Sequence, residues 1–226
     1  MRGSLAAIAR LSAAAATVLA LVLPASADPT SIELAAKFAR GEYMAAASEA
    51  ETAAGADDLA FAARALLAFC MTGEQEPDAA IIDRASRDAE AALTLEPDHG
   101  EGRLQLAIAL SLKSRPMDAM TAWSAGYGEK GRKLAEDVLA ADPTNFYAHG
   151  FLAVWNIEVE QRGGGFGAWV MGASLDKAVA HLRDRPARLD ECIRARMIHA
   201  PRAVVWQNIR NVSARAKKIE GLLDHR

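Results

Sequence analysis

The chain of 226 residues has few of the residues that build all-β folds. Its 51 alanines outnumber its 13 aromatic residues about fourfold, and strand-length runs of β-branched residues are nearly absent. β-Sandwiches and barrels need aromatic and β-branched side chains, whereas alanine, leucine, glutamate and arginine favour helices. An apolar fraction of 51% is enough for one sizeable core and excludes a disordered chain. The composition therefore predicts an all-α protein.

The spacings that mark metal sites and nucleophilic catalysis are also missing. The five histidines are dispersed, and no H-E-x-x-H, C-x-x-C or G-x-S-x-G pattern occurs. We therefore expect no metal, no cofactor and no enzymatic activity. Residues 126–131 do spell G-x-G-x-x-G, but the dinucleotide fingerprint needs a preceding strand, which this sequence does not provide. We interpret these residues as a turn before a helix over residues 131–141.

Cysteine is scarce, with Cys70 and Cys192 the two in the chain. Cys70 lies in an apolar stretch of helical character, where a thiol usually acts as a small buried hydrophobe. A Cys70–Cys192 disulfide would join distant repeat units, which a stack of repeats keeps apart. We expect free thiols, with the disulfide as the alternative.

Acidic residues are absent before Asp28, and residues 1–27 have the anatomy of a secretory signal peptide. A basic start precedes an apolar run over residues 11–23, and small residues end the segment at Ala27. This run of about 13 residues is shorter than the ~20 that a membrane-spanning helix needs. We expect cleavage after Ala27 and an exported, periplasmic protein without stable membrane insertion. An uncleaved anchor is the alternative.

Charge is distributed unevenly along the rest of the chain. Residues 28–174 carry 12 basic and 23 acidic side chains, a net charge of −11, whereas residues 175–226 carry 12 and 6, a net charge of +6. The expected protein therefore has an acidic body and a basic tail. Export makes nucleic acid an improbable partner, so we expect the tail to meet an acidic partner, an anionic membrane surface or the protein's own body.

Two segments share one spacing of small residues that ends at a proline. The matching positions are Ala85, Ala89, Ala92 and Pro97 in the first, and Gly131, Ala135, Val138 and Pro143 in the second. This spacing resembles the tetratricopeptide repeat, whose two antiparallel helices approach closely where side chains are small. The resemblance implies a solenoid of helix-turn-helix units. The two prolines lie 46 residues apart instead of the family's about 34, which indicates an insertion near residues 114–130.

These observations divide the chain into three parts. We predict a signal peptide over residues 1–27, degenerate tetratricopeptide-like repeats over residues 28–174, and a basic C-terminal helical cap or tail over residues 175–226. The glycine run at residues 163–167 should break any helix. Ser174 is placed to cap the next helix. A partly disordered tail is the alternative to an ordered cap.

Aromatic residues provide the strongest interaction signal. Tyr147, Phe151 and Trp155 are spaced four apart, so they share one face of a helix. One interpretation is that this stripe packs against the next helix. The other follows from the repeat resemblance: these residues line a concave partner-binding groove, with Glu101 and Leu104 as their counterparts one unit earlier.

The sequence leads to two hypotheses of function. The first is an exported, non-catalytic protein-interaction scaffold or accessory subunit, because repeat solenoids present extended binding surfaces. The second is a small-molecule or lipid-binding accessory protein. The resemblance implies that such a protein serves an envelope assembly or a solute-uptake system. The second hypothesis predicts an enclosed apolar pocket near residues 146–155 and 166–169.

Overall fold

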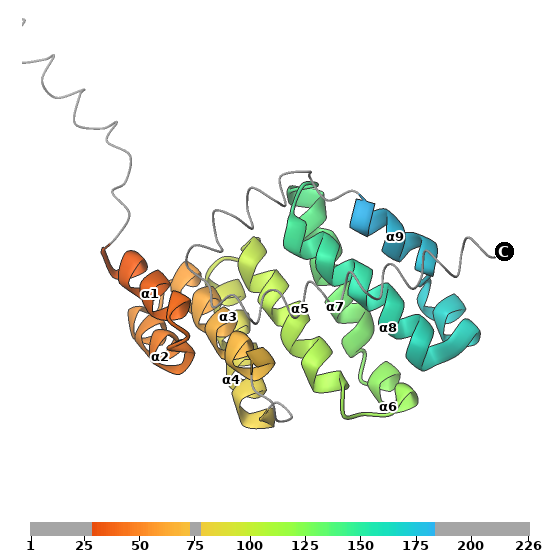
Figure 1. The fold of residues 1–226 in the computed structure, drawn as a ribbon, viewed down its shortest axis with the longest axis horizontal. Coiled ribbons are helices and arrows are strands. Elements are labelled where there is room, and N and C mark those ends of the chain that lie inside the picture. The colour runs from red at the N-terminus through yellow and green to blue at the C-terminus, as the bar shows by residue number, and fades with distance from the viewer. Residues whose placement is uncertain (1–28, 73–77, 184–226) are drawn as a thin grey trace, which may run out of the picture. The chain divides into compact units, whose positions relative to one another are not determined.

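The computed structural model describes residues 29–72 and 78–183 (Figure 1). The expected signal peptide, Cys192 and residues 184–226 of the expected cap lie outside the described residues. The chain divides into two units, Met1–Glu33 and Leu34–Arg226. In the first unit, the described residues form the start of one helix.

All regular secondary structure within the described ranges is α-helical, which confirms the predicted all-α class. The helices are α1 (Pro29–Ala39), α2 (Tyr43–Ala53), α3 (Ala56–Thr72), α4 (Ala79–Leu95), α5 (Gly100–Ser114), α6 (Ala119–Ser124), α7 (Tyr127–Ala141), α8 (Phe146–Met171) and α9 (Leu175–Arg183).

Helices pack mainly against their neighbours in sequence. α3 lies between α2 and α4, α5 contacts α3, α4 and α7, and α8 lies between α7 and α9 (Figure 1). α5 and α7 pack directly on one another. The short helix α6, which lies between them in the sequence, packs beside α7. The pocket described below is formed where α5 to α8 meet.

Small side chains lie where the helices approach most closely. Ala85, Ala89 and Ala92 of α4 are fully buried, as the repeat spacing predicts. A Cβ atom added to Gly102 of α5 would lie 3.4 Å from the Cβ of Ala92, at van der Waals contact. Gly131 of α7 is equally restricted, because an added Cβ would lie 3.4 Å from Cζ of Phe151. Larger residues at these positions would push the helices apart.

Ion pairs join helices that are not consecutive in sequence. Arg84 of α4 donates hydrogen bonds to the carboxylate of Glu51 on α2. Asp88, one turn along α4 from Arg84, has a buried Oδ2 without a hydrogen-bond partner among the described residues. Burial, followed by the negative charge of Glu51, raises the pKa of Asp88 to about 7. The contact between α2 and α4 therefore contains a carboxyl group that titrates near neutral pH.

The glycine run interrupts α8 at one residue only. Gly164 has φ 59° and ψ −168°, and the helix continues on both sides of it. This region of the backbone map is essentially restricted to glycine. The predicted break is thus confined to Gly164. Beyond α8, Ser174 caps α9 as predicted: its hydroxyl oxygen accepts a hydrogen bond from the backbone N–H of Lys177 at 3.2 Å.

The other glycine motif forms part of a helix. Gly126 has a left-handed backbone conformation with φ 70°, and α7 begins at the next residue. The expectation of a turn over residues 126–131 is therefore wrong beyond Gly126. Gly128 lies close to α8: an added Cβ would lie 3.1 Å from Cε of Met171, so the end of that methionine side chain would have to shift.

Candidate functional site

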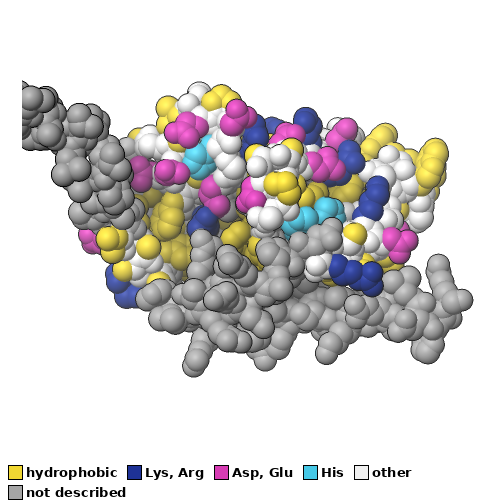
Figure 2. All heavy atoms as spheres, turned by 90° about the horizontal axis from the view of Figure 1, so that it is seen from above, with side chains coloured by type: hydrophobic (Ala, Val, Ile, Leu, Met, Phe, Trp, Pro, Cys, Tyr) yellow, Lys and Arg dark blue, Asp and Glu magenta, His cyan; other side chains and the backbone are white. Residues whose placement is uncertain are grey.

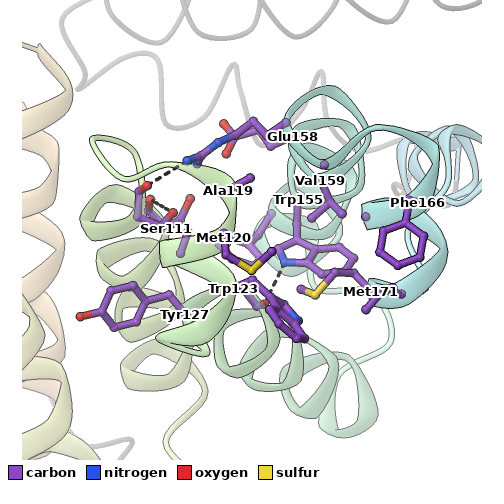
Figure 3. A pocket seen from close by; sticks show the side chains of 18 residues that line it. Ser111, Ala119, Met120, Trp123, Tyr127, Trp155, Glu158, Val159, Phe166 and Met171 are labelled. Atoms are coloured by element: carbon purple, nitrogen blue, oxygen red, sulfur yellow. Dashed lines mark hydrogen bonds between the residues drawn. The ribbon is translucent and has the colours of Figure 1, made fainter.

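A cavity of about 330 Å³ lies among α5, α6, α7 and α8 (Figure 3). The end of α5, one face of α6 and the start of α7 form one side of it. The other side comes from two stretches of α8, before and after its break at Gly164. Because most of the lining side chains are apolar, the cavity is suited to an apolar ligand.

Trp155 forms the best-anchored part of the wall. Its side chain is only 8% exposed, and its Nε1–H donates a hydrogen bond to the carbonyl oxygen of Gly128 at 2.8 Å (Figure 3). The guanidinium carbon of Arg132 lies 5.5 Å from the centre of the indole ring, within the range of a cation–π interaction. The hydrogen bond and the arginine fix the orientation of this ring. The wall is therefore present before any ligand binds.

The rim of the cavity exposes large apolar side chains to solvent. Trp123 of α6 is 55% exposed and Phe166 of α8 is 77% exposed. Met120 and Val170 are also exposed and line the same cavity. Figure 2 shows hydrophobic side chains on several parts of the visible face, and one group of them lies at the end where Figure 1 places the end of α8. Contiguous apolar surface of this kind commonly marks a binding site.

Polar groups gather at one end of the cavity. Ser111 and Ser114 come from α5, and Glu158 and Arg162 come from α8. Arg162 donates hydrogen bonds to the carbonyl oxygens of Ser114, at 3.1 Å, and of Met117. Since the last carbonyls of a helix lack partners inside it, Arg162 both satisfies the end of α5 and ties α8 to it.

The structure separates the five residues of the predicted groove. Phe151 and Trp155 lie together on the cavity wall. Leu104 is buried in a core cluster with residues of α7 and α8, and Glu101 forms an ion pair with an arginine of α3. Tyr147 is 47% exposed. Binding of a protein partner by these five residues therefore remains a prediction.

Met120 and Trp123 are functional candidates that the sequence reasoning missed. Both lie in the predicted insertion, and they are three residues apart on α6, so they share a face of that helix. Every residue of α6 is at least partly exposed. The sequence signal that could have identified them is the presence of a tryptophan and a methionine within this short inserted segment.

The surroundings of His149 and Cys70 in the described part of the chain indicate structural roles for both side chains. Nδ1 of His149 lies 3.1 Å from Nδ1 of His181, and Nε2 of His149 lies 2.9 Å from the carbonyl oxygen of Pro143. Within residues 29–72 and 78–183, no group of three or more metal-ligating side chains gathers. Cys70 is buried, and burial raises the pKa of its thiol, which disfavours the reactive thiolate.

None of the helices in the described ranges is both long and apolar enough to cross a membrane. No protein-family model, no curated protein and no solved structure matches this chain.

Proposed function

We propose that this chain is an exported, non-catalytic binding protein of degenerate tetratricopeptide-like repeats, and that its cavity binds an apolar small molecule. The observation that carries the proposal is the cavity of about 330 Å³, with its apolar wall and exposed apolar rim. The second of the two functional hypotheses from the sequence thus has the stronger structural support.

The size and chemistry of the cavity support this proposal. Small-molecule sites are concave, measure roughly 300–1,000 Å³ and combine an apolar lining with a few placed polar groups. A docking helix from a protein partner would instead need anchors in a row along an extended groove. Here the apolar side chains surround one compact space and come from three helices: Met120 and Trp123, Phe151 and Trp155, and Tyr127.

The architectural part of the proposal is supported by the pattern of packing. Helices contact their neighbours in sequence, and the small residues of the repeat spacing lie buried between them. Both features are typical of helical repeat arrays. Export is inferred from residues 1–27 of the sequence.

The proposal is tested with N-phenyl-1-naphthylamine, an uncharged probe that fluoresces in apolar surroundings. We expect saturable binding to the purified protein. Ala122 lines the cavity and is partly buried, so Ala122→Leu should fill part of it and weaken probe binding about tenfold. The matched control is Ala140→Leu, an exposed position on α7 outside the cavity. Absence of saturable binding, or equal affinity of the two variants, would contradict the proposal.

A protein-interaction scaffold is the second candidate, and the observation in its favour is the exposed Tyr147 on α8. A photoreactive amino acid at position 147 should then yield one defined protein adduct in the envelope. The control is the same substitution at Leu95, which is exposed on α4. Adducts that do not differ between the two positions would remove this candidate.

A further inference from the structure

The cavity has two chemically different ends, and this difference bears on the ligand. Figure 3 shows Ser111 and Glu158 toward one side, while the rings of Trp123, Trp155 and Phe166 lie toward the other. An occupant that satisfies both ends must itself be amphipathic, because a wholly apolar molecule would leave the polar end without partners. The following inference rests on the proposed function, since it concerns the ligand of the same cavity.

Charges at the polar end balance. Glu158 and Arg162 line the cavity with one negative and one positive group. Next to them, Nη2 of Arg115 lies 4.0 Å from Oε1 of Glu158. The carbonyl of Met117 accepts a hydrogen bond from Arg162, and Asp118 is the next residue in the chain. The Asp118 carboxylate caps α6 by accepting hydrogen bonds from two backbone N–H groups. The cavity lining itself thus carries one cation, Arg162, and one anion, Glu158.

Hydrogen-bonding capacity at this end is mixed. The separation of Glu158 from Arg115 exceeds hydrogen-bond length, so the Glu158 carboxylate can accept from a ligand. Ser114 donates its hydroxyl proton to the carbonyl of Ser111 at 2.8 Å, which leaves Ser114 Oγ as an acceptor. The hydroxyl of Ser111 and the further N–H groups of Arg162 are donors, since a guanidinium carries five of them.

A charged head group would gain little here. A carboxylate would be attracted by Arg162 but repelled by Glu158, and an ammonium group would meet the reverse. Either would also lose water on entering the cavity, which costs more for a charged group than for a neutral one. A hydroxyl or a primary amide can donate to Glu158 and accept from Arg162 or Ser111 without that cost.

We infer that the ligand is an uncharged amphipath. Its hydroxyl or amide head group hydrogen-bonds to Glu158 and Arg162, and its apolar tail lies among Trp123, Trp155 and Phe166. Specificity comes from rejection of charged head groups as much as from attraction of neutral ones.

The test is displacement of N-phenyl-1-naphthylamine by three molecules with the same tail: dodecan-1-ol, dodecanoate and dodecyltrimethylammonium. We expect dodecan-1-ol to displace the probe at an about tenfold lower concentration than either ion. Displacement by an ion at an equal or lower concentration would overturn this inference while leaving the proposed function intact. Failure of the probe itself to bind would overturn both.

A charge variant provides the second measurement. Glu158→Gln leaves Arg162 without an opposing carboxylate in the cavity lining, so dodecanoate should gain about tenfold in affinity, whereas dodecan-1-ol should bind more weakly because its hydroxyl loses a charged acceptor. Glu160→Gln is the control, because Glu160 lies on the same helix and outside the cavity lining. Thermal unfolding of both variants verifies that they fold. A dodecanoate affinity that is unchanged in Glu158→Gln would contradict a role for Glu158 in selecting the head group.

Discussion

The helices α2 to α5 and the helices α6 to α8 use their side chains in different ways. In the first region, fully buried alanines and leucines from several helices form one continuous core cluster. In the second region, the buried residues form smaller clusters around aromatic side chains, and a cavity lies between the helices. Small residues let helices close on one another, whereas large rings next to a backbone break hold them apart. One helical framework thus contains both a tightly packed core and a cavity.

The largest expected effect comes from deletion of core atoms in the two regions. Leu66 of α3 is fully buried, so Leu66→Ala should lower the free energy of unfolding by about 2–5 kcal/mol. Val159 of α8 lines the cavity and is partly exposed, so Val159→Ala should cost about 1 kcal/mol or less. Urea denaturation measures both values. Equal losses would show that the two regions are packed alike.

Added side-chain volume should also destabilise the region of α2 to α5 more than the region of α6 to α8. Ala89 of α4 is fully buried, and Ala89→Leu should destabilise the protein by about 1–3 kcal/mol because the neighbouring helices must move. Ala122→Leu, on the cavity wall, should change stability by less than about 0.5 kcal/mol while it weakens probe binding. A severe loss of stability in Ala122→Leu would mean that the cavity has no room to spare.

The break in α8 allows a comparison within one glycine run. Gly164 has a left-handed φ that alanine adopts only with strain, so Gly164→Ala should cost about 1–3 kcal/mol. Gly165 has no atom within 4 Å of an added Cβ, and Gly165→Ala should stabilise the helix by about 0.4–1 kcal/mol. Melting temperatures of the two variants should therefore shift in opposite directions. Shifts of the same sign would contradict a break confined to Gly164.

The smallest expected effect is a pH dependence in the tightly packed region. Burial, then Glu51, raises the pKa of Asp88 from 3.8 to about 7, so the folded state disfavours the ionised carboxylate. The unfolded chain releases this proton first, and the contribution of Asp88 to stability therefore falls as pH rises from about 4 to about 7. Asp88→Asn should remove this loss, which we expect to be about 1 kcal/mol after allowance for partial exposure.

Urea titrations at several pH values between 4 and 8 measure this effect. The advantage of Asp88→Asn over the wild type should grow up to pH about 7 and then stay constant. Glu90→Gln, an exposed position on the same helix, should give a curve parallel to that of the wild type. A parallel curve for Asp88→Asn as well would exclude Asp88 as the titrating group.

Local features of the fold could be predicted from the sequence. The small-residue spacing identified Ala85, Ala89 and Ala92, which are buried, and a short polar side chain before a helix identified Ser174 as a cap. Such features depend on a few neighbouring residues. Gly128 was misread as part of a turn, because its place in α7 beside Met171 of α8 depends on a contact that a single sequence does not reveal.

The candidate site could be predicted only in part. Residues 146–155 and 166–169 were expected to border an apolar pocket, and Phe151, Trp155 and Phe166 do line the cavity. The opposite wall, with Met120 and Trp123, comes from the inserted segment, and no spacing rule relates that segment to α8. Arg162 joins α8 to the residues just before α6 through hydrogen bonds to Ser114 and Met117, which lie 48 and 45 residues away in the chain.

Because each helix packs mainly on its neighbours in sequence, different helices can unfold locally at different rates. Contacts between nearby segments favour rapid folding, and they let one part of an array open while the rest stays folded. Amide protons in α3 and α4 should then exchange with solvent most slowly, and those of the exposed α6 most rapidly. If the cavity binds the proposed ligand, the rate of ligand entry should follow the local opening rate of α6 and not the rate of global unfolding.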